Sequence, residues 1–524
     1  MLQQLLRTKS IAPHGSSGLK KCLTAFDLAL LGIGCAIGTG IFVLTGLAAA
    51  TQSGPAVVLS FIFAGIASGF AALSYAELAA SIGGSGSAYG YSYVAFGEFI
   101  AWVMGWILLL EYGVGAAAVA NGWAGYFVTT LANFNMHLPE ALTKAPMMGG
   151  SINLPAFSII WILTALLILG VKESARVNNI IVVIKLSTIA IFITLAIGHL
   201  NTANWQPFMP FGWFSTLDNG KNIGVLAGAS LVFFAYFGFD AVSTAAEECK
   251  NPQRDLPIGL LASLAFCTIV YIIVSGLLTG IVPYTELNTS SPVAYALTKL
   301  GYTWASTLVA TGVLAGLITV LLVLLYGLTR ILFAMSRDGL ISPIFSTINP
   351  DRQTPTRIIL MCGAVVSLVA GFIPLGELAE TVNIGTLASF VMVCVGVIVL
   401  RVRQPNLPRP FKNPWNPLIP VLGILSCGAL MTFLPASTWH RFLWWILAGV
   451  EFYCLYSVYF SKLNKEDKTH PVFQFKFFTR LTGLILGLLI SYFITSQPEL
   501  LSNNLAYGSI AGLVIGYLVG LFKK

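Results

Sequence analysis

Four glycines interrupt the middle of an apolar stretch near the N-terminus, and the backbone amides there could bind a ligand. The stretch reads Gly32-Ile-Gly-Cys-Ala-Ile-Gly-Thr-Gly-Ile-Phe42. Hydrocarbon offers backbone N–H and C=O groups no partners, so a broken helix is tolerated in a membrane only where it lines a cavity. A helical segment that begins near Gly40 would present the amides of Gly38 to Ile41 and its positive dipole end, which favour an anion. The alternative is that these glycines only allow close helix packing.

A second apolar stretch carries the complementary chemistry. It runs from Gly228 to Glu248 and is interrupted near Gly238. Its first half should end near Phe234, where unpaired carbonyls at a helix C-terminus favour a cation. The two breaks together would hold the carboxylate and the ammonium of a zwitterionic amino acid. The aromatic residues at this break are either lipid-facing or, for one or two of them, a lid over the ligand: Phe234, Tyr236, Phe237 and Phe239.

Three ionisable residues lie inside apolar stretches, where a charge is costly and a functional role is the default interpretation. Lys185 either extends to the membrane surface or is a buried amine that exchanges a proton where a coupling sodium ion would otherwise bind. Glu111 either binds a cationic side chain of the ligand or pairs with a nearby donor. Asp240 follows the second break, where accepting backbone amide bonds is favoured over a role in gating.

The composition is that of a polytopic membrane protein. The chain has 524 residues, of which 56% are hydrophobic and 9% charged, whereas soluble domains carry roughly 25% charge. The first 26 residues are polar and basic and lack the apolar core of a signal peptide. The sequence has no Walker A or H-E-x-x-H motif, and its five histidines fall in tails and loops, so an enzyme is not indicated. The eight cysteines form no C-x-x-C pair and are expected to be small buried hydrophobes.

Fourteen apolar stretches are long enough to cross a bilayer. Placing both termini in the cytoplasm puts 23 of the 28 Lys and Arg residues in cytoplasmic segments and 4 outside, with Lys185 within a span, as the positive-inside rule requires. The net charge of +8 follows from this topology and indicates no nucleic-acid partner. The expected spans are 27–50, 55–80, 97–131, 154–170, 178–199, 222–248, 257–282, 303–336, 356–373, 379–402, 417–435, 441–461, 478–495 and 505–522.

The spans fall into two groups of five with matching features. Spans 1 and 6 are both interrupted, and spans 3 and 8 are both unusually long. Paired interruptions in two inverted halves indicate a transport site. The predicted fold is therefore all-α, with a five-plus-five inverted-repeat core at 27–402. A cytoplasmic segment at 1–26 precedes the core, and peripheral helices 11–14 follow it at 403–524.

Several motifs together resemble the amino acid–polyamine–organocation superfamily, and most of all its cationic amino acid transporter branch. The first is the glycine-rich run at 32–42. The others, in chain order, are Ser74-Tyr-Ala-Glu-Leu-Ala, Gly83-Gly-Ser-Gly-Ser-Ala-Tyr, Leu110-Glu-Tyr, the run that ends at Glu247-Glu248, Asn251-Pro-Gln-Arg-Asp-Leu-Pro and Met335-Ser-Arg-Asp-Gly-Leu. The resemblance is strong over about 27–360 and looser beyond.

The resemblance implies the fold of the sodium-coupled leucine transporter, with broken helices 1 and 6, and an integral protein of the plasma (inner) membrane. It also implies a role for each candidate residue. The substrate carboxylate would meet Gly38, Thr39 and Gly40, flanked by Ile37 and Ile41. The ammonium would meet the carbonyls of Ala36, Phe234, Ala235 and Phe237. Lys185 matches the family's lysine for proton coupling, and Glu111 matches its third-helix glutamate.

The leading hypothesis is a proton-coupled amino acid permease, a symporter that needs no cofactor. The proton is favoured over sodium as the coupling ion because of Lys185. Arginine, lysine and ornithine or small neutral amino acids are the expected substrates. The eighth span carries no acidic residue in Thr319-Val-Leu-Leu-Val-Leu-Leu-Tyr326, which weakens the cationic alternative. An amino acid exchanger of the same fold and a membrane amino acid sensor remain alternatives. The expected partners are the amino acid and the lipid bilayer.

Overall fold

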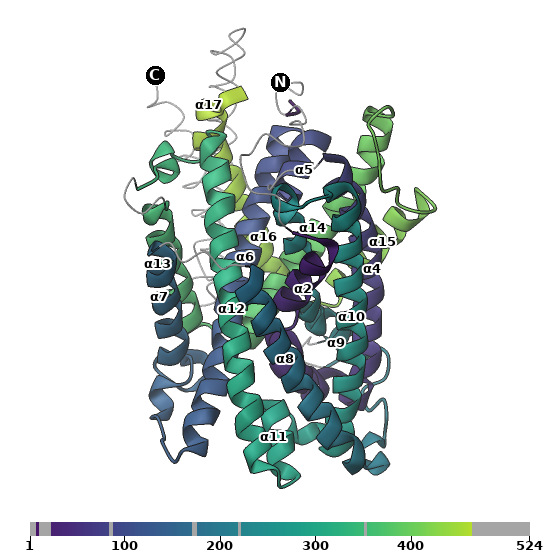
Figure 1. Ribbon diagram of the computed structural model, residues 1–524, viewed down its shortest axis with the longest axis vertical. Helices are drawn as coiled ribbons and strands as arrows, with labels where there is room; N and C mark the ends of the chain where they lie inside the picture. Colours follow the sequence, from purple (N-terminus) through teal and green to yellow (C-terminus); the bar gives the residue numbers. More distant parts are fainter. Residues whose placement is uncertain are drawn as a thin grey trace, which may run out of the picture.

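The computed structural model describes residues 7–9, 23–82, 87–169, 175–217, 222–349 and 354–463. Almost all of these residues are helical, and the long helices run side by side along the long axis of the molecule (Figure 1). A single strand pair interrupts this pattern in the described residues. It joins β1 (Ser215–Thr216) to β2 (Asn222–Ile223) in antiparallel register.

Within the described residues, seven helical segments are long and apolar enough to cross a membrane, which confirms an integral membrane protein. Helices α15 (Leu418–Thr432) and α16 (Ala436–Phe452) meet at a bend of 115° and would add an eighth span if counted as one. Three predicted spans are shorter apolar helices: α2 (Ala25–Ala36), α7 (Leu154–Ile168) and α13 (Thr356–Phe372). The seven segments are Gly40–Ile82, Glu98–Asn133, Asn179–His199, Val225–Ser243, Pro252–Ile281, Thr303–Arg337 and Leu375–Arg403.

The predicted count of fourteen spans stays a prediction. Its last two members, 478–495 and 505–522, lie outside the described residues. The other long helices have bounds close to the expected ones. They are α4 (Val57–Ile82), α6 (Glu98–Asn133), α8 (Ala175–Ala196), α10 (Pro252–Ile281), α12 (Thr303–Arg337) and α14 (Leu375–Arg403).

The first apolar stretch is interrupted where its glycines predict. Helix α2 begins at a capping box, in which the Thr24 side chain and the Asp27 side chain each bond the other's backbone amide. It ends at Ala36, because Ile37 leaves the helical region with φ −73° and ψ 95°. Helical structure resumes with the π-helix η1 (Gly40–Leu44). It continues through α3 (Thr45–Ala48), η2 (Ala49–Ser53) and η3 (Gly54–Ala56) into α4.

The second interruption is also present. Helix α9 (Val225–Val232) passes into the 3-10 turn η8 (Phe233–Tyr236), and Phe237 then adopts an extended conformation. Gly238 follows with φ +100°, a left-handed conformation that side chains rarely adopt. The chain continues as η9 (Phe239–Glu248). The backbone conformation at this break therefore favours glycine at position 238.

The start of the first broken stretch and the end of the second are hydrogen-bonded to each other. Leu23, before α2, forms a parallel bridge with Cys249, after η9. The Lys250 amide donates to the Leu23 carbonyl at 2.9 Å. The first broken stretch therefore begins, and the second one ends, at one shared backbone contact.

Helices α6 and α12 are the longest unbroken helices, with 36 and 35 residues. Short helices lie at opposite ends of the molecule, with α5 (Ser87–Ala95) near one end and α11 (Pro292–Lys299) near the other (Figure 1). The remaining short elements are η4 (Glu140–Leu142), η5 (Pro146–Met148), η6 (Ile197–His199), η7 (Thr202–Trp205), η10 (Tyr284–Glu286), η11 (Pro343–Ser346), η12 (Tyr453–Ser457) and α17 (Val458–Phe460).

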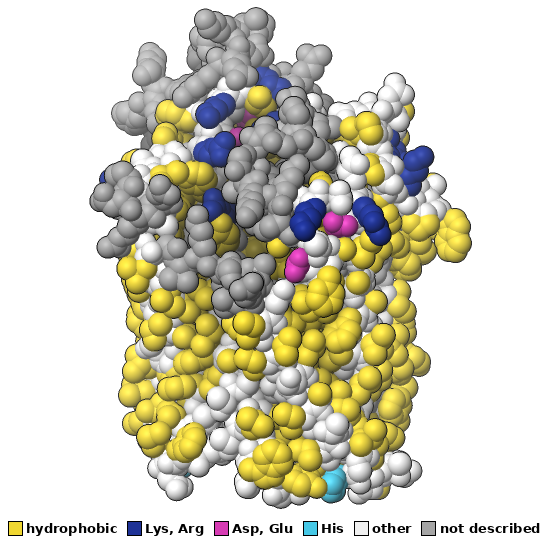
Figure 2. Space-filling model, in the orientation of Figure 1, with side chains coloured by type: hydrophobic (Ala, Val, Ile, Leu, Met, Phe, Trp, Pro, Cys, Tyr) yellow, Lys and Arg dark blue, Asp and Glu magenta, His cyan; other side chains and the backbone are white. Residues whose placement is uncertain are grey.

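The surface has the distribution that a bilayer requires. Figure 2 shows hydrophobic side chains over most of the height of one face, with Lys and Arg gathered toward the end where α5 and α17 lie. Large aliphatic side chains such as Ile184, Ile269 and Leu368 are exposed on the flanks, and lipid is the solvent that suits them. The seven cysteines in the described residues are all buried, as the sequence predicts.

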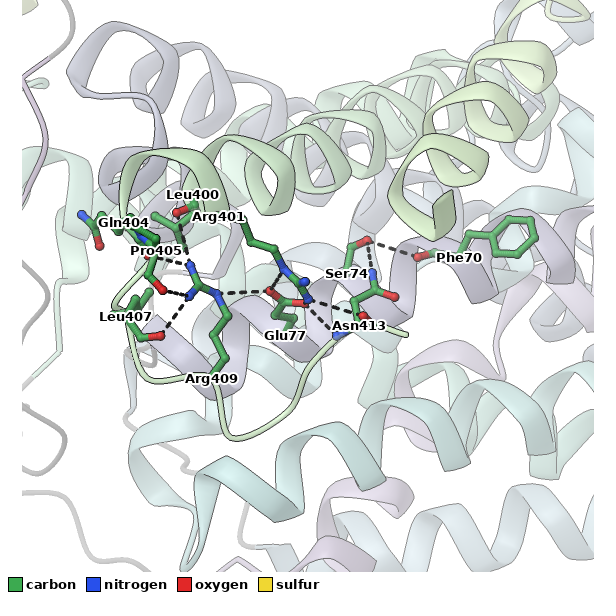
Figure 3. Close-up of polar contacts among 10 residues, drawn as sticks. All are labelled: Phe70, Ser74, Glu77, Leu400, Arg401, Gln404, Pro405, Leu407, Arg409 and Asn413. Carbon is green, nitrogen blue, oxygen red and sulfur yellow. Dashed lines mark hydrogen bonds and ion pairs between the residues drawn. The ribbon is translucent and has the colours of Figure 1, made fainter. Parts of the chain in front are cut away.

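An ionic cluster fastens the end of α4 to α14 and the loop that follows α14 (Figure 3). The Glu77 carboxylate accepts bonds from Arg401 Nε at 2.9 Å and Nη2 at 2.7 Å. It also accepts the Asn413 amide at 2.7 Å and lies 3.5 Å from Arg409 Nε. The cluster thus pairs Glu77 with Arg401 in the last turn of α14 and with Arg409 in the loop that follows.

Glu77→Gln should destabilise the protein markedly. Glu77 is only 2% exposed and forms ion pairs with two arginines, and removing one partner of a buried ion pair costs about 3 to 5 kcal/mol. Denaturant unfolding in micelles would measure the loss. Glu140→Gln is the matched control, because Glu140 pairs with Lys144 on the surface and its loss should have no measurable effect. Equal stability of the two variants would contradict a structural role for the cluster.

Candidate functional site

The two helix breaks meet at Gly40 and Ala235. A Cβ atom on Gly40 would overlap the main chain of Ala235, so η1 and η8 touch backbone to backbone. Gly38 faces α12 at ordinary contact distances, with 3.6 Å from its Cβ position to Val320 Cγ2 and 3.8 Å to Leu317 Cδ2. The amide end of one half-helix therefore lies against the last turn of the other.

The amides at the first break are arranged as donors to an anion. The Ile37 amide still donates to the Ile33 carbonyl at 2.9 Å, and the Phe42 amide donates back to the Gly38 carbonyl at 3.3 Å. The amides between them, from Gly38 to Ile41, open the second segment, and the first amides of a helix lack intrahelical acceptors. The buried Thr39 hydroxyl has no hydrogen-bond partner among the described residues. It packs against Gly122 of α6, whose Cβ position lies 2.6 Å from the hydroxyl oxygen.

Tyr271 of α10 connects the carbonyls of both breaks. Its hydroxyl lies 2.8 Å from the Ala36 carbonyl oxygen and 2.8 Å from that of Ala235. The Phe234 carbonyl accepts the Phe237 amide at 3.2 Å. Each of these three carbonyls retains a second lone pair for an ammonium donor. Sequence reasoning missed Tyr271, although a lone phenol within the apolar seventh span was a usable signal.

Lys185 of α8 is held inside the protein. Its side chain is 1% exposed, and its Nζ donates to the Gly34 carbonyl at 2.6 Å. Its aliphatic stem packs against Gly316 of α12, where a Cβ would lie 2.7 Å from the lysine Cγ and Cε atoms. The ammonium thus binds the last turn of α2, whose carbonyl end favours a cation. Of the two interpretations from sequence, this placement fits the buried amine rather than the lysine that extends to the surface.

Glu111 and Asp240 are both completely buried. Ser389 of α14 donates to Glu111 Oε2 at 3.2 Å, and Glu111 Oε1 has no partner. Asp240 stands in the first turn of η9. The nearby amides of Gly238 and Ala241 act on its charge, but neither carboxylate oxygen has an aligned hydrogen-bond donor in the described residues. The amide bonds expected for Asp240 from the sequence stay a prediction, with the amides of Gly238 and Ala241 close to its carboxylate.

The four aromatic residues of the second break divide into two pairs. Phe234 and Phe237 stay together at the break, with ring centroids 5.9 Å apart. Tyr236 instead donates to the Phe61 carbonyl at 2.8 Å, and Phe239 packs on Phe390 at 5.2 Å. Only Phe234 and Phe237 are therefore placed where a lid over a ligand could form.

Comparisons with known proteins agree with this architecture. A sequence model of the family described as "Amino acid permease" matches residues 23–452. A methylthioribose transporter of Bacillus subtilis is 48% identical over 470 residues, which cover 88% of this chain and 100% of that protein. A branched-chain amino acid permease of the same organism is 48% identical over 475 residues, 89% of this chain and 100% of that protein. The vacuolar cationic amino acid transporter 4 of Arabidopsis thaliana is 39% identical over 405 residues, 76% of this chain and 66% of that protein.

Gly40→Ala should force the two breaks apart. The added methyl group would overlap the Ala235 main chain, and overpacking of this kind costs about 1 to 3 kcal/mol. Thermal unfolding in detergent would measure the change. Gly38→Ala is the matched control for stability, because its methyl group would meet Val320 and Leu317 at 3.6 to 3.9 Å. If Gly40→Ala were as stable as Gly38→Ala, the close contact of the two breaks would be refuted.

Proposed function

The chain belongs to the amino acid permease family of the amino acid–polyamine–organocation superfamily, and from this premise we propose that it is a proton-coupled amino acid importer that works by alternating access. The observation that carries the proposal is the meeting of the two breaks at Gly40 and Ala235. Amides on one side and carbonyls on the other suit the two charges of an amino acid. The family members among the relatives are transporters and permeases, which points to a transporter rather than an enzyme.

The substrate carboxylate would bind the amides of Gly38, Thr39 and Gly40, with Ile37 and Ile41 on either side. The ammonium would bind among carbonyls of both breaks, one from the first break and three from the second. The two charged groups of the zwitterion would then be hydrogen-bond partners for backbone amides and carbonyls that lipid cannot satisfy. The carbonyls in question belong to Ala36, Phe234, Ala235 and Phe237.

A neutral, aliphatic amino acid is the substrate that the surroundings of Gly38 favour. Leu317 and Val320 of α12 face this glycine, and an apolar wall gives a charged side chain no partner. A branched-chain amino acid permease is also among the relatives at 48% identity. A cationic amino acid is the second candidate, supported by the buried carboxylate of Glu111 and by the cationic amino acid transporters among the relatives.

We further propose two inverted five-helix repeats at 27–402, preceded by a cytoplasmic segment at 1–26 and followed by peripheral helices at 403–524. The two broken stretches, α2–η1 and α9–η9, occupy corresponding places in this scheme, as do the long helices α6 and α12. Fourteen spans with both termini in the cytoplasm agree with the concentration of Lys and Arg at one end of the molecule (Figure 2).

Uptake into proteoliposomes tests the function. Labelled leucine should accumulate, an inward proton gradient should stimulate it, and arginine should compete poorly. Preferential accumulation of arginine would overturn the aliphatic assignment in favour of the cationic one. Leucine uptake that occurs only with amino acid inside the vesicles would indicate an exchanger. Binding without any uptake would indicate a sensor. Stimulation by a sodium gradient instead of a proton gradient would overturn the choice of coupling ion.

Lys185→Ala should uncouple uptake from the proton gradient. The ammonium binds the Gly34 carbonyl at the end of α2, so gain and loss of its proton would fix and release that half-helix. The ratio of uptake with and without the gradient should fall toward one. Lys144→Ala, at an exposed lysine, should retain the wild-type ratio. A normal ratio in Lys185→Ala would refute the coupling role.

A further inference from the structure

One face of α12 is exposed along the whole length of the helix. Its exposed and half-exposed positions recur every three or four residues, which places them on a single side. Trp304, which is 62% exposed, begins this stripe at the α11 end of the helix, and Arg337 ends it (Figure 1). Arg330 lies in the same stripe and is also exposed. The positions between are mostly apolar, such as Leu308 and Ile318, so lipid is the solvent that suits this face.

Each of the two arginines stacks on an aromatic ring of the same stripe. The guanidinium carbon of Arg330 lies 4.7 Å from the centroid of the Tyr326 ring, and that of Arg337 lies 6.0 Å from the centroid of the Phe333 ring. In both pairs the ring precedes the arginine by one helical turn. Both guanidinium groups are therefore turned back along α12, toward the middle of the membrane. A side chain that only extends to water would point the other way.

Neither guanidinium has an acidic partner. Among the described residues, no carboxylate forms an ion pair with Arg330 or Arg337. The neighbouring acid, Asp338, is bound instead to Lys9 at 3.0 Å and to the Tyr89 hydroxyl of α5 at 2.8 Å. An aromatic ring meets the plane of a guanidinium and leaves the N–H donors at its edge for other acceptors. Two positive charges with such donors thus lie on a lipid-facing surface.

The length of α12 places Arg330 at the level of lipid headgroups. Tryptophan at a membrane surface lies at this level, and the axial distance from Trp304 to Arg330 is roughly 39 Å at 1.5 Å per residue. A bilayer measures about 30 Å across its hydrocarbon core and about 40 to 45 Å with its headgroup regions. With Trp304 in one headgroup layer, Arg330 therefore lies in the other, at the end of the molecule where Lys and Arg gather (Figure 2).

We propose that Arg330 and Arg337 form a binding site for the headgroup of an anionic phospholipid. Arg330, stacked on Tyr326, would donate two parallel N–H bonds to the phosphate oxygens, a geometry that a guanidinium matches and an ammonium does not. Arg337, about 10 Å further along the helix, would add attraction that salt screens only in part. The acyl chains would lie along the apolar part of the stripe. The site faces lipid rather than the two breaks, so it does not rest on the proposed transport function.

Charge and apolar surface together decide the occupant. A zwitterionic phospholipid carries a cation beside its phosphate, and the two arginines repel that cation. An anionic phospholipid such as phosphatidylglycerol has no such cation and is attracted by basic side chains at the membrane surface. A free phosphate ion could accept the same hydrogen bonds but would gain nothing from the apolar stripe beside them.

Native mass spectrometry of the purified full chain in detergent tests the site, because it resolves individual bound lipids. Phosphatidylglycerol is the probe, titrated against phosphatidylcholine with the same acyl chains, and one molecule of it should bind more tightly than phosphatidylcholine. Arg330→Ala should weaken this binding about tenfold, the loss expected for one charge-assisted contact. Arg330→Lys should also weaken it, because an ammonium keeps the charge but not the paired donors. Tyr326→Leu should weaken it less, since the guanidinium remains.

Arg254→Ala is the matched control. Arg254 is exposed in the first turn of α10, and no ring lies over its guanidinium among the described residues. Its loss should leave the affinity for phosphatidylglycerol unchanged. All the substituted side chains are exposed, so thermal unfolding without added lipid should match that of the wild type and show that each variant is folded.

Four results would overturn the proposal. Wild-type affinity in Arg330→Ala would exclude the site, and wild-type affinity in Arg330→Lys or an equal loss in Arg254→Ala would show only a diffuse attraction between charges. Equal binding of phosphatidylcholine would contradict the anionic headgroup. Displacement of the bound lipid by inorganic phosphate would make a free anion the occupant in place of a lipid.

Discussion

The hydrogen-bonding requirement of the peptide group governs this protein. Within a membrane, a helix can be interrupted only where something other than lipid meets the exposed amides and carbonyls. The chain interrupts two helices and places the interruptions against each other, with Gly40 in contact with the main chain of Ala235. Tyr271 then serves the carbonyls of both breaks with one hydroxyl. The groups that remain are donors on one side and acceptors on the other, which is the complement of an amino acid.

The buried ionisable side chains are stabilised in three different ways. Glu77 is neutralised by two arginines and a backbone amide, so it fixes α4 to α14. Lys185 donates to the carbonyl end of a half-helix, which favours a cation. Glu111 accepts a bond from Ser389. The charge of Glu77 is therefore met by opposite charges, and that of Lys185 by a helix end.

Much of this arrangement could be predicted from sequence because its signals are local. Glycines within apolar stretches located both breaks, and apolar length located the helices through α14 to within a few residues. Contacts between distant segments could not be predicted in the same way. Nothing near Tyr271 in the chain indicates that its hydroxyl would reach Ala36 and Ala235. The expected amide bonds to Asp240 were a local inference from its position after Gly238. The complete burial of this carboxylate, by contrast, depends on the helices packed around η9.

The assignments of substrate and coupling ion constrain each other through Glu111. An ionised Glu111 would be a buried acid in the middle of α6 able to attract a cationic side chain, and its charge would then be neutralised by the substrate. A protonated Glu111 offers no such attraction, and the apolar residues Leu317 and Val320 beside Gly38 then become the dominant surroundings of the substrate. Glu111 is completely buried and forms no ion pair with a described cation. Under the proposed transport function, an uncharged Glu111 therefore goes with an aliphatic substrate and an ionised Glu111 with a cationic one.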